Sequence, residues 1–148
     1  MSEQGVSAPD ADANRVVVGV DGSEPSKLAL RWAAELAPTL GARVEAVAAW
    51  HSPSTLGYSY IPDGWRPDLD AEKLLTATVA EVFGDQRPEG LRMLTIEGNP
   101  AEVLICESAT AKLIVVGSRG HGGFVGLMIG SVSASTAEHA KCPVLVVH

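Results

Sequence analysis

Short apolar runs alternate along the chain with longer stretches in which apolar residues recur at helical spacing. The runs at 15–20 and 113–116 are almost continuous, which is typical of strands buried on both faces of a parallel sheet. The run at 91–96 alternates apolar and polar residues, as a half-exposed strand would. The pattern predicts five strands, at 15–20, 44–50, 91–96, 113–116 and 143–147.

Helical spacing follows the turn at 21–25, which supplies a capping Ser or Asp and a proline for the first helical turn. From Ala29 to Leu40 apolar residues recur at steps of three and one, which predicts an amphipathic helix that ends at Gly41. Three more helices are predicted, from Asp68 to Gly84, from the turn at 98–100 onward, and from about Ser131 to Ala140.

Alternation of strands with helices predicts βαβ units, whose right-handed crossovers place helices on both faces of a parallel sheet. The 148 residues suffice for one α/β domain, which we expect to be an open five-stranded parallel sheet over 15–148. Such sheets bind ligands at the carboxyl ends of their strands, where the strand order reverses. The polar residues 1–14 are expected to be a disordered tail. The aperiodic segment 51–67 is expected to be a lid or a mobile loop.

Charge and composition narrow the possible partners. The 11 Lys and Arg against 18 Asp and Glu give a net charge of −7, which argues against non-specific nucleic-acid binding. No apolar run approaches the ~18–20 residues that span a bilayer, and no basic-then-apolar leader opens the chain. A cytoplasmic protein with no membrane partner is therefore expected. Cys106 and Cys142 form no CxxC pair and are expected to be inert thiols.

A glycine-rich segment carries the clearest chemical signal. Six of the 15 glycines fall within 117–130, and such a cluster needs a reason because glycine is costly in backbone entropy. The segment follows a predicted strand and precedes a predicted helix, so its N–H groups and the helix N-terminus could bind an anion. Ser131 and Ser133 would add hydroxyl donors, and Arg119 a cation. The simpler alternative is a glycine loop with a plain serine cap.

The spacing of these glycines distinguishes between phosphate loops. The chain contains no Gly-Lys pair for a Walker A loop, no GxGxxG, and no paired histidines of the nucleotidylyl-transferase kind. The segment does match Gly-x2-Gly-x9-Gly-Ser at Gly117, Gly120, Gly130 and Ser131. This pattern resembles the ATP-binding motif of the universal stress protein family. The stretches 16–23, 98–101 and 142–147 resemble other parts of that family in the same order.

This resemblance implies a Rossmann-like fold of the adenine nucleotide alpha hydrolase kind, with strand order 3-2-1-4-5 and ATP, with or without Mg²⁺, across strands one and four. It implies that Gly19 and Asp21 lie against the adenosine and that the backbone of Ala49 meets the adenine edge. An alternative role for Asp21 is that of a helix cap, which is compatible with binding.

At the other end of the ligand, the resemblance places Gly117 and Gly120 near the ribose and first phosphates. It places the outer phosphates against Gly130, Ser131 and Val132. Fast phosphoryl transfer needs a metal-holding acid, a water-orienting base and a cationic clamp. Only Arg119 and Asp21 are candidates for these roles, so we expect no catalytic residue and no metal ligand.

Two functions remain open from the sequence. The first is a nucleotide-dependent regulatory or stress-response module that holds ATP. The second is a slow ATPase or an adenylyl-transfer enzyme on the same fold. The intact glycine motif argues against a third, blander possibility, a family member that dimerises without nucleotide. A homodimer through the last strand is expected, because 144–147 is apolar and uncharged and the inferred order makes this strand an edge.

Overall fold

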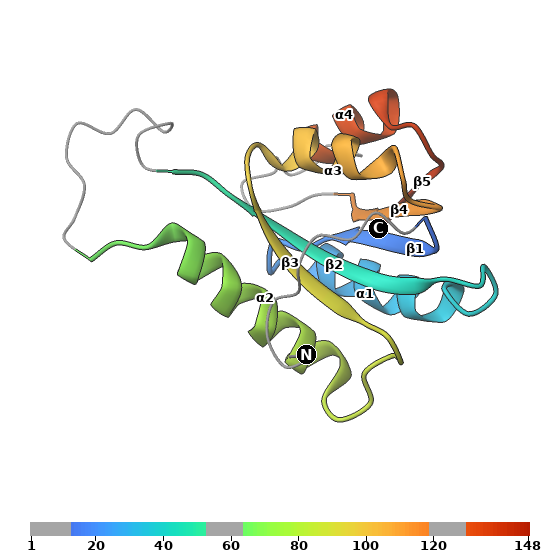
Figure 1. Cartoon of the computed structure of the whole chain (residues 1–148), viewed down its shortest axis with the longest axis horizontal. Helices are drawn as coiled ribbons and strands as arrows, with labels where there is room; N and C mark the ends of the chain where they lie inside the picture. The colour runs from blue at the N-terminus through green and yellow to red at the C-terminus, as the bar shows by residue number, and fades with distance from the viewer. Residues whose placement is uncertain (1–12, 53–63, 119–129) are drawn as a thin grey trace.

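The computed structural model describes residues 13–52, 64–118 and 130–148. Most of the predicted tail, most of the predicted loop at 51–67, and Arg119 and Gly120 lie outside these residues, so those expectations stay predictions. Strands and helices alternate strictly along the described chain (Figure 1). Their bounds are β1 (Arg15–Gly19), α1 (Glu24–Leu36), β2 (Arg43–Trp50), α2 (Pro67–Phe83), β3 (Arg92–Glu97), α3 (Pro100–Ser108), β4 (Leu113–Gly117), α4 (Ser131–His139) and β5 (Val144–Val147).

All five strands form one sheet in the order β3-β2-β1-β4-β5, and every neighbouring pair is parallel. The fold and the strand order predicted from the sequence are therefore confirmed. Helices α1 and α2 cover one face of the sheet and α3 and α4 the other (Figure 1). Successive residues of β1 enter the two cores in turn, since Val16 and Val18 pack on the side of α1 while Val17 packs on the side of α3.

Helix α1 begins where the sequence predicts and ends earlier. The Ser23 side chain caps its N-terminus by accepting a hydrogen bond from the backbone N–H of Ser26. The periodic apolar residues continue to Leu40, but the helix ends at Leu36 and a series of turns follows. Pro38 has no N–H to continue the helical ladder, and Gly41 reverses the chain with a φ of +64°.

The remaining elements begin and end within one or two residues of their predicted positions. Asn99 caps α3 by accepting hydrogen bonds from the N–H groups of Ala101 and Glu102, at 2.9 and 3.3 Å. Within residues 13–52, 64–118 and 130–148, no helix is long and apolar enough to cross a membrane.

A buried charge cluster at the amino ends of the strands was not predicted. Arg15, at the start of β1, is 1% exposed and donates hydrogen bonds to the carboxylates of Glu45 and Glu107. It also donates to Thr110 Oγ1 at 2.6 Å. Burial raises the pKa of Glu45 above its usual value, although the charge of Arg15 opposes that rise. The cluster therefore lies at the end of the sheet opposite to the carboxyl ends of the strands.

Candidate functional site

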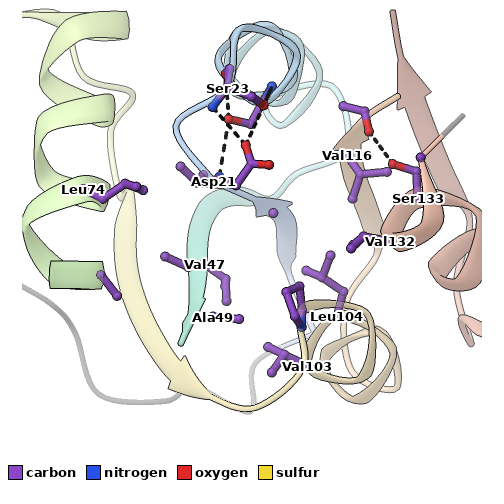
Figure 2. A pocket seen from close by; sticks show the side chains of 18 of the residues that line it. Asp21, Ser23, Val47, Ala49, Leu74, Val103, Leu104, Val116, Val132 and Ser133 are labelled. Atoms are coloured by element: carbon purple, nitrogen blue, oxygen red, sulfur yellow. Dashed lines mark hydrogen bonds between the residues drawn. The ribbon is translucent and has the colours of Figure 1, made fainter. Parts of the chain in front are cut away.

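A pocket of about 420 Å³ opens at the carboxyl ends of the central strands, where the strand order reverses. Figure 2 shows its walls: Asp21 after β1, Ala49 near the end of β2, Leu74 from α2, and Val132 from α4. This is the position that the topology of an open parallel sheet predicts for a ligand. The pocket therefore becomes the candidate site.

One side of the pocket is apolar. Val47 and Ala49 of β2 form part of it, Val103 and Leu104 of α3 continue it, and Leu74 of α2 closes it (Figure 2). The small side chain of Ala49, with Ala48 and Ala71, leaves room beside the sheet. A surface of this kind can hold a flat, weakly polar ring, because the ring gains burial without meeting an unpaired charge.

The polar side begins at Asp21, whose carboxylate is fixed by the turn into α1. Asp21 Oδ1 accepts hydrogen bonds from the backbone N–H of Ser23 at 2.9 Å and from its hydroxyl at 2.5 Å. The Ser26 hydroxyl donates to the carbonyl of Ser23 at 2.9 Å, which closes the same turn. Ser23, and not Asp21, is the helix cap, so Asp21 is an acceptor held at the pocket wall.

The second polar wall is the N-terminus of α4. Gly130 is its N-cap, and Ser131, Val132 and Ser133 form its first turn at the pocket. Gly130 has no side chain that could accept a hydrogen bond from the first amides of the helix, and it makes no side-chain cap bond. A helix N-terminus also carries about half a positive charge, which favours an anion. The Ser133 hydroxyl, however, donates to the carbonyl of Gly117 (Figure 2).

Two glycines of the site are required by packing. A Cβ on Gly117 would lie 2.5 Å from Cβ of Pro25 and 2.7 Å from its carbonyl carbon, so the end of β4 touches the first turn of α1. A Cβ on Gly19 would lie 2.9 Å from Cδ1 of Leu104. The close packing around both glycines exists without any ligand. The resemblance had implied ligand contact for both residues, and the fold supplies a separate reason for glycine there.

The structure brings together eight of the ten residues predicted for the site. These eight pocket-lining residues are Gly19, Asp21, Ala49, Gly117, Gly130, Ser131, Val132 and Ser133. Arg119 and Gly120 lie outside the described residues.

Sequence reasoning missed the contributions of α2 and α3, which include Leu74, Pro100 and Val103. Their apolar residues have the spacing of ordinary core positions and carry no separate signal. Among the described residues, no group of three or more His, Cys, Asp or Glu side chains could hold a metal ion.

The sequence of this chain is similar to those of universal stress proteins. Universal stress protein Rv1996 of Mycobacterium tuberculosis is 34% identical over 135 residues, which cover 88% of this chain and 43% of that protein. The chain thus spans less than half the length of this relative.

Two solved structures share the fold. A universal stress protein in complex with cAMP has a TM-score of 0.67 and 26% identity, over 91% of this chain and 97% of the other. The universal stress protein from Archaeoglobus fulgidus in complex with dAMP has a TM-score of 0.62 and 23% identity, over 90% and 97%. The family model described as universal stress protein family matches residues 13–148, and the chain therefore belongs to that family.

Proposed function

We propose that the pocket binds an adenine nucleotide, with ATP as its ligand, and that the protein acts as a nucleotide-dependent regulatory module in the stress response. One observation carries this proposal: the pocket joins an apolar surface suited to a flat base with the N-terminus of a helix suited to phosphate. The family member solved with cAMP supports the class of ligand.

Each wall then has a part of the nucleotide to recognise. The adenine ring would lie on the apolar side, with its edge at the backbone of Ala49, and the Asp21 carboxylate would accept from the ribose hydroxyls. The outer phosphates would lie at Gly130, Ser131 and Val132. Mg²⁺ would enter with the phosphates of ATP rather than through a metal site of the described residues.

A binding module is favoured over an enzyme by the charges of the pocket. Among the described residues that line it, Asp21 is the only charged side chain. Rapid phosphoryl transfer depends on cations that neutralise charge on the transferred group and on a base that orients the nucleophile. We therefore propose that the occupied and empty states differ in what they bind, with hydrolysis slow or absent. Slow ATPase or adenylyl-transfer activity is the alternative that a turnover assay would detect.

We also propose a homodimer through β5. Among the described strands, β5 pairs with β4 alone, and Val144–Val147 carries no charge. An apolar strand edge invites pairing with another chain, and a two-fold antiparallel contact would cover both edges at once. A cytoplasmic location would suit the free thiols Cys106 and Cys142, because that compartment keeps thiols reduced.

Calorimetry of the full chain tests the nucleotide proposal. ATP, AMP, cAMP and adenosine would be titrated separately, and GTP would serve as the control for base recognition. We expect ATP to bind and GTP to bind at least tenfold more weakly, because the guanine edge has the opposite donor and acceptor pattern. Absence of binding by every adenine nucleotide would overturn the proposal. If an ATP turnover assay shows many turnovers per second, the protein is an enzyme and not a regulatory module.

A further inference from the structure

Two hydrogen bonds join the end of β4 to the start of α4. The Gly130 N–H donates to the carbonyl of Ser118, and the Ser133 hydroxyl donates to the carbonyl of Gly117. The Ser118 N–H in turn donates to the carbonyl of Val147 at 2.7 Å, which ties the same point to β5. The residues on either side of the glycine-rich segment are thus fastened to each other and to the sheet.

The two serines at this end of the pocket occupy different environments. Ser133 is 4% exposed and its one hydroxyl proton is given to Gly117, so that proton is not available to a ligand (Figure 2). Ser131, two residues earlier, lines the pocket and is exposed. The exposed serine is placed to contact a ligand, and the buried one is placed to hold the helix.

Among the described residues, helix α4 buries little large apolar surface. Its two buried residues are Ser133 and Thr136, and neither carries a large apolar side chain. The Thr136 hydroxyl donates within the helix to the carbonyl of Val132, so it adds no link to the sheet. Val132 adds partial apolar packing. Helix α4 also contacts α3 and β5, and beyond its C-terminus the Lys141 N–H donates to Ser108 Oγ at 2.8 Å. The Ser133 bond is a side-chain contact that holds its first turn to the end of β4.

We propose that Ser133 is a positioning residue for the phosphate end of the nucleotide. Its bond to Gly117 fixes the direction of the first amides of α4 toward the pocket, and it acts through those amides without touching the ligand. This inference rests on the proposed function. It predicts selectivity between ligands, because most of the apolar side of the pocket comes from β2, α2 and α3.

The test compares Ser133→Ala with Ser131→Ala in the full chain, using ATP and adenosine as ligands. Ser133→Ala should bind ATP up to about tenfold more weakly, because the amides are then no longer held in place before binding and one buried hydrogen bond sets the upper limit of that cost. It should bind adenosine with unchanged affinity. Ser133→Thr keeps the hydroxyl and should stay within about twofold of the wild type. Ser131→Ala should also weaken ATP binding.

Amide hydrogen exchange of the ligand-free protein separates positioning from direct contact. In Ser133→Ala the amides of Gly130 and Ala134 should exchange faster before any ligand is added, whereas Ser131→Ala should leave them unchanged. Unchanged ATP affinity in Ser133→Ala, equal losses for ATP and adenosine, or unchanged exchange beside weaker ATP binding would each overturn the inference. A wild-type chain that binds no adenine nucleotide overturns the proposed function instead. The exchange comparison then still shows whether the bond from Ser133 to Gly117 holds the start of α4 in place.

Discussion

The carboxyl end of β4 lies so close to α1 that a Cβ on Gly117 would stand 2.5 Å from Cβ of Pro25. The first glycine of the nucleotide motif is therefore enclosed by the fold before any ligand arrives. Neither the backbone of Pro25 nor the last residue of a central strand can move aside easily. Gly117, which was identified by its place in a binding motif, is thus also required for the packing of β4 against α1.

Alanine at Gly117 should accordingly destabilise the ligand-free protein. The added methyl group must displace the first turn of α1, and overpacking of this kind costs about 1–3 kcal/mol. Gly19→Ala provides the comparison, because its nearest contact is Cδ1 of the flexible Leu104 side chain, and its loss should be smaller. Urea denaturation of both variants measures the difference. Equal stability of Gly117→Ala and wild type would contradict the packing role.

Leu74 supplies a test of the apolar side of the pocket. It lines the pocket and is 37% exposed, whereas Leu69 on the same helix is 41% exposed and does not line it. Leu74→Asp should weaken adenosine and ATP binding at least tenfold, because a carboxylate there loses its hydration when a base covers it. Leu69→Asp, the matched control, should bind both ligands as the wild type does. If calorimetry finds equal affinities for Leu74→Asp and Leu69→Asp, the base does not lie against Leu74.

Ser23 links the cap of α1 to the Asp21 carboxylate, so its loss should affect stability and binding together. Ser23→Ala removes a cap, which costs about 0.5–2 kcal/mol, and a hydrogen bond to Asp21. Asn99→Ala removes the cap of α3 and should destabilise by a similar amount while leaving Asp21 in place. Because α3 also lines the pocket, we expect adenosine binding to weaken more in Ser23→Ala than in Asn99→Ala, as measured by calorimetry beside thermal unfolding. Equal binding by the two variants would mean that Asp21 needs no support.

The contrast between Asp21 and Leu74 shows how far the sequence could predict the site. Asp21 directly follows an apolar strand and precedes a helical turn, so local pattern and topology place it at the strand end. The alternation of elements predicted a parallel sheet, whereas the strand order was implied by the family resemblance. Leu74 had no such signal, because its contribution depends on the position of α2 relative to β2, which is decided by packing between distant segments.

Arg15 illustrates a different limit. At the head of an apolar run it resembles the boundary residue of a strand, yet it is buried against Glu45 and Glu107, which are 30 and 92 residues away. The sequence pattern does not show which charged residues pair when the partners are far apart along the chain. The same applies to Ser133, since only the folded structure shows that its hydroxyl bonds to a carbonyl 16 residues earlier.

The Arg15 cluster predicts a stability that depends on pH. Arg15→Met leaves Glu45 buried, with Glu107 close by and Arg92 Nε 3.8 Å from Glu45 Oε2. Burial already raises the pKa of Glu45, and removal of Arg15 should raise it further. A carboxyl whose pKa is higher in the folded state loses its stabilising contribution as pH rises through that pKa.

Arg15→Met should therefore be destabilised by about 3–5 kcal/mol at neutral pH, as for a buried ion pair that loses one partner. At a lower pH the deficit should shrink as Glu45 takes up a proton, because its pKa is raised in the folded state. The double variant Arg15→Met/Glu45→Gln has no charge at this position, so its difference from the wild type should change much less with pH. Urea denaturation at both pH values provides the measurement. A deficit in Arg15→Met that stays constant with pH would show that Glu45 does not titrate in this range.

The β5 edge gives the last prediction, a dimer that one backbone change should separate. The Ile114 N–H donates to the carbonyl of Pro143 at 3.0 Å and the Ser118 N–H to that of Val147 at 2.7 Å, so alternate residues of β5 face β4. By this alternation the backbone groups of Val144 and Val146 point away from β4, toward the edge. Val146→Pro removes an outward N–H and keeps the inward ladder, as proline in an edge strand allows. Lysine at Val147 would be a poorer test, because that side chain is 6% exposed and its replacement would disturb the core.

Light scattering at micromolar concentration should show a wild-type dimer, a Val146→Ala dimer and a Val146→Pro monomer that still binds ATP, since the pocket is built within one chain. A wild-type monomer, or a dimer that survives Val146→Pro, would place the contact elsewhere or remove it.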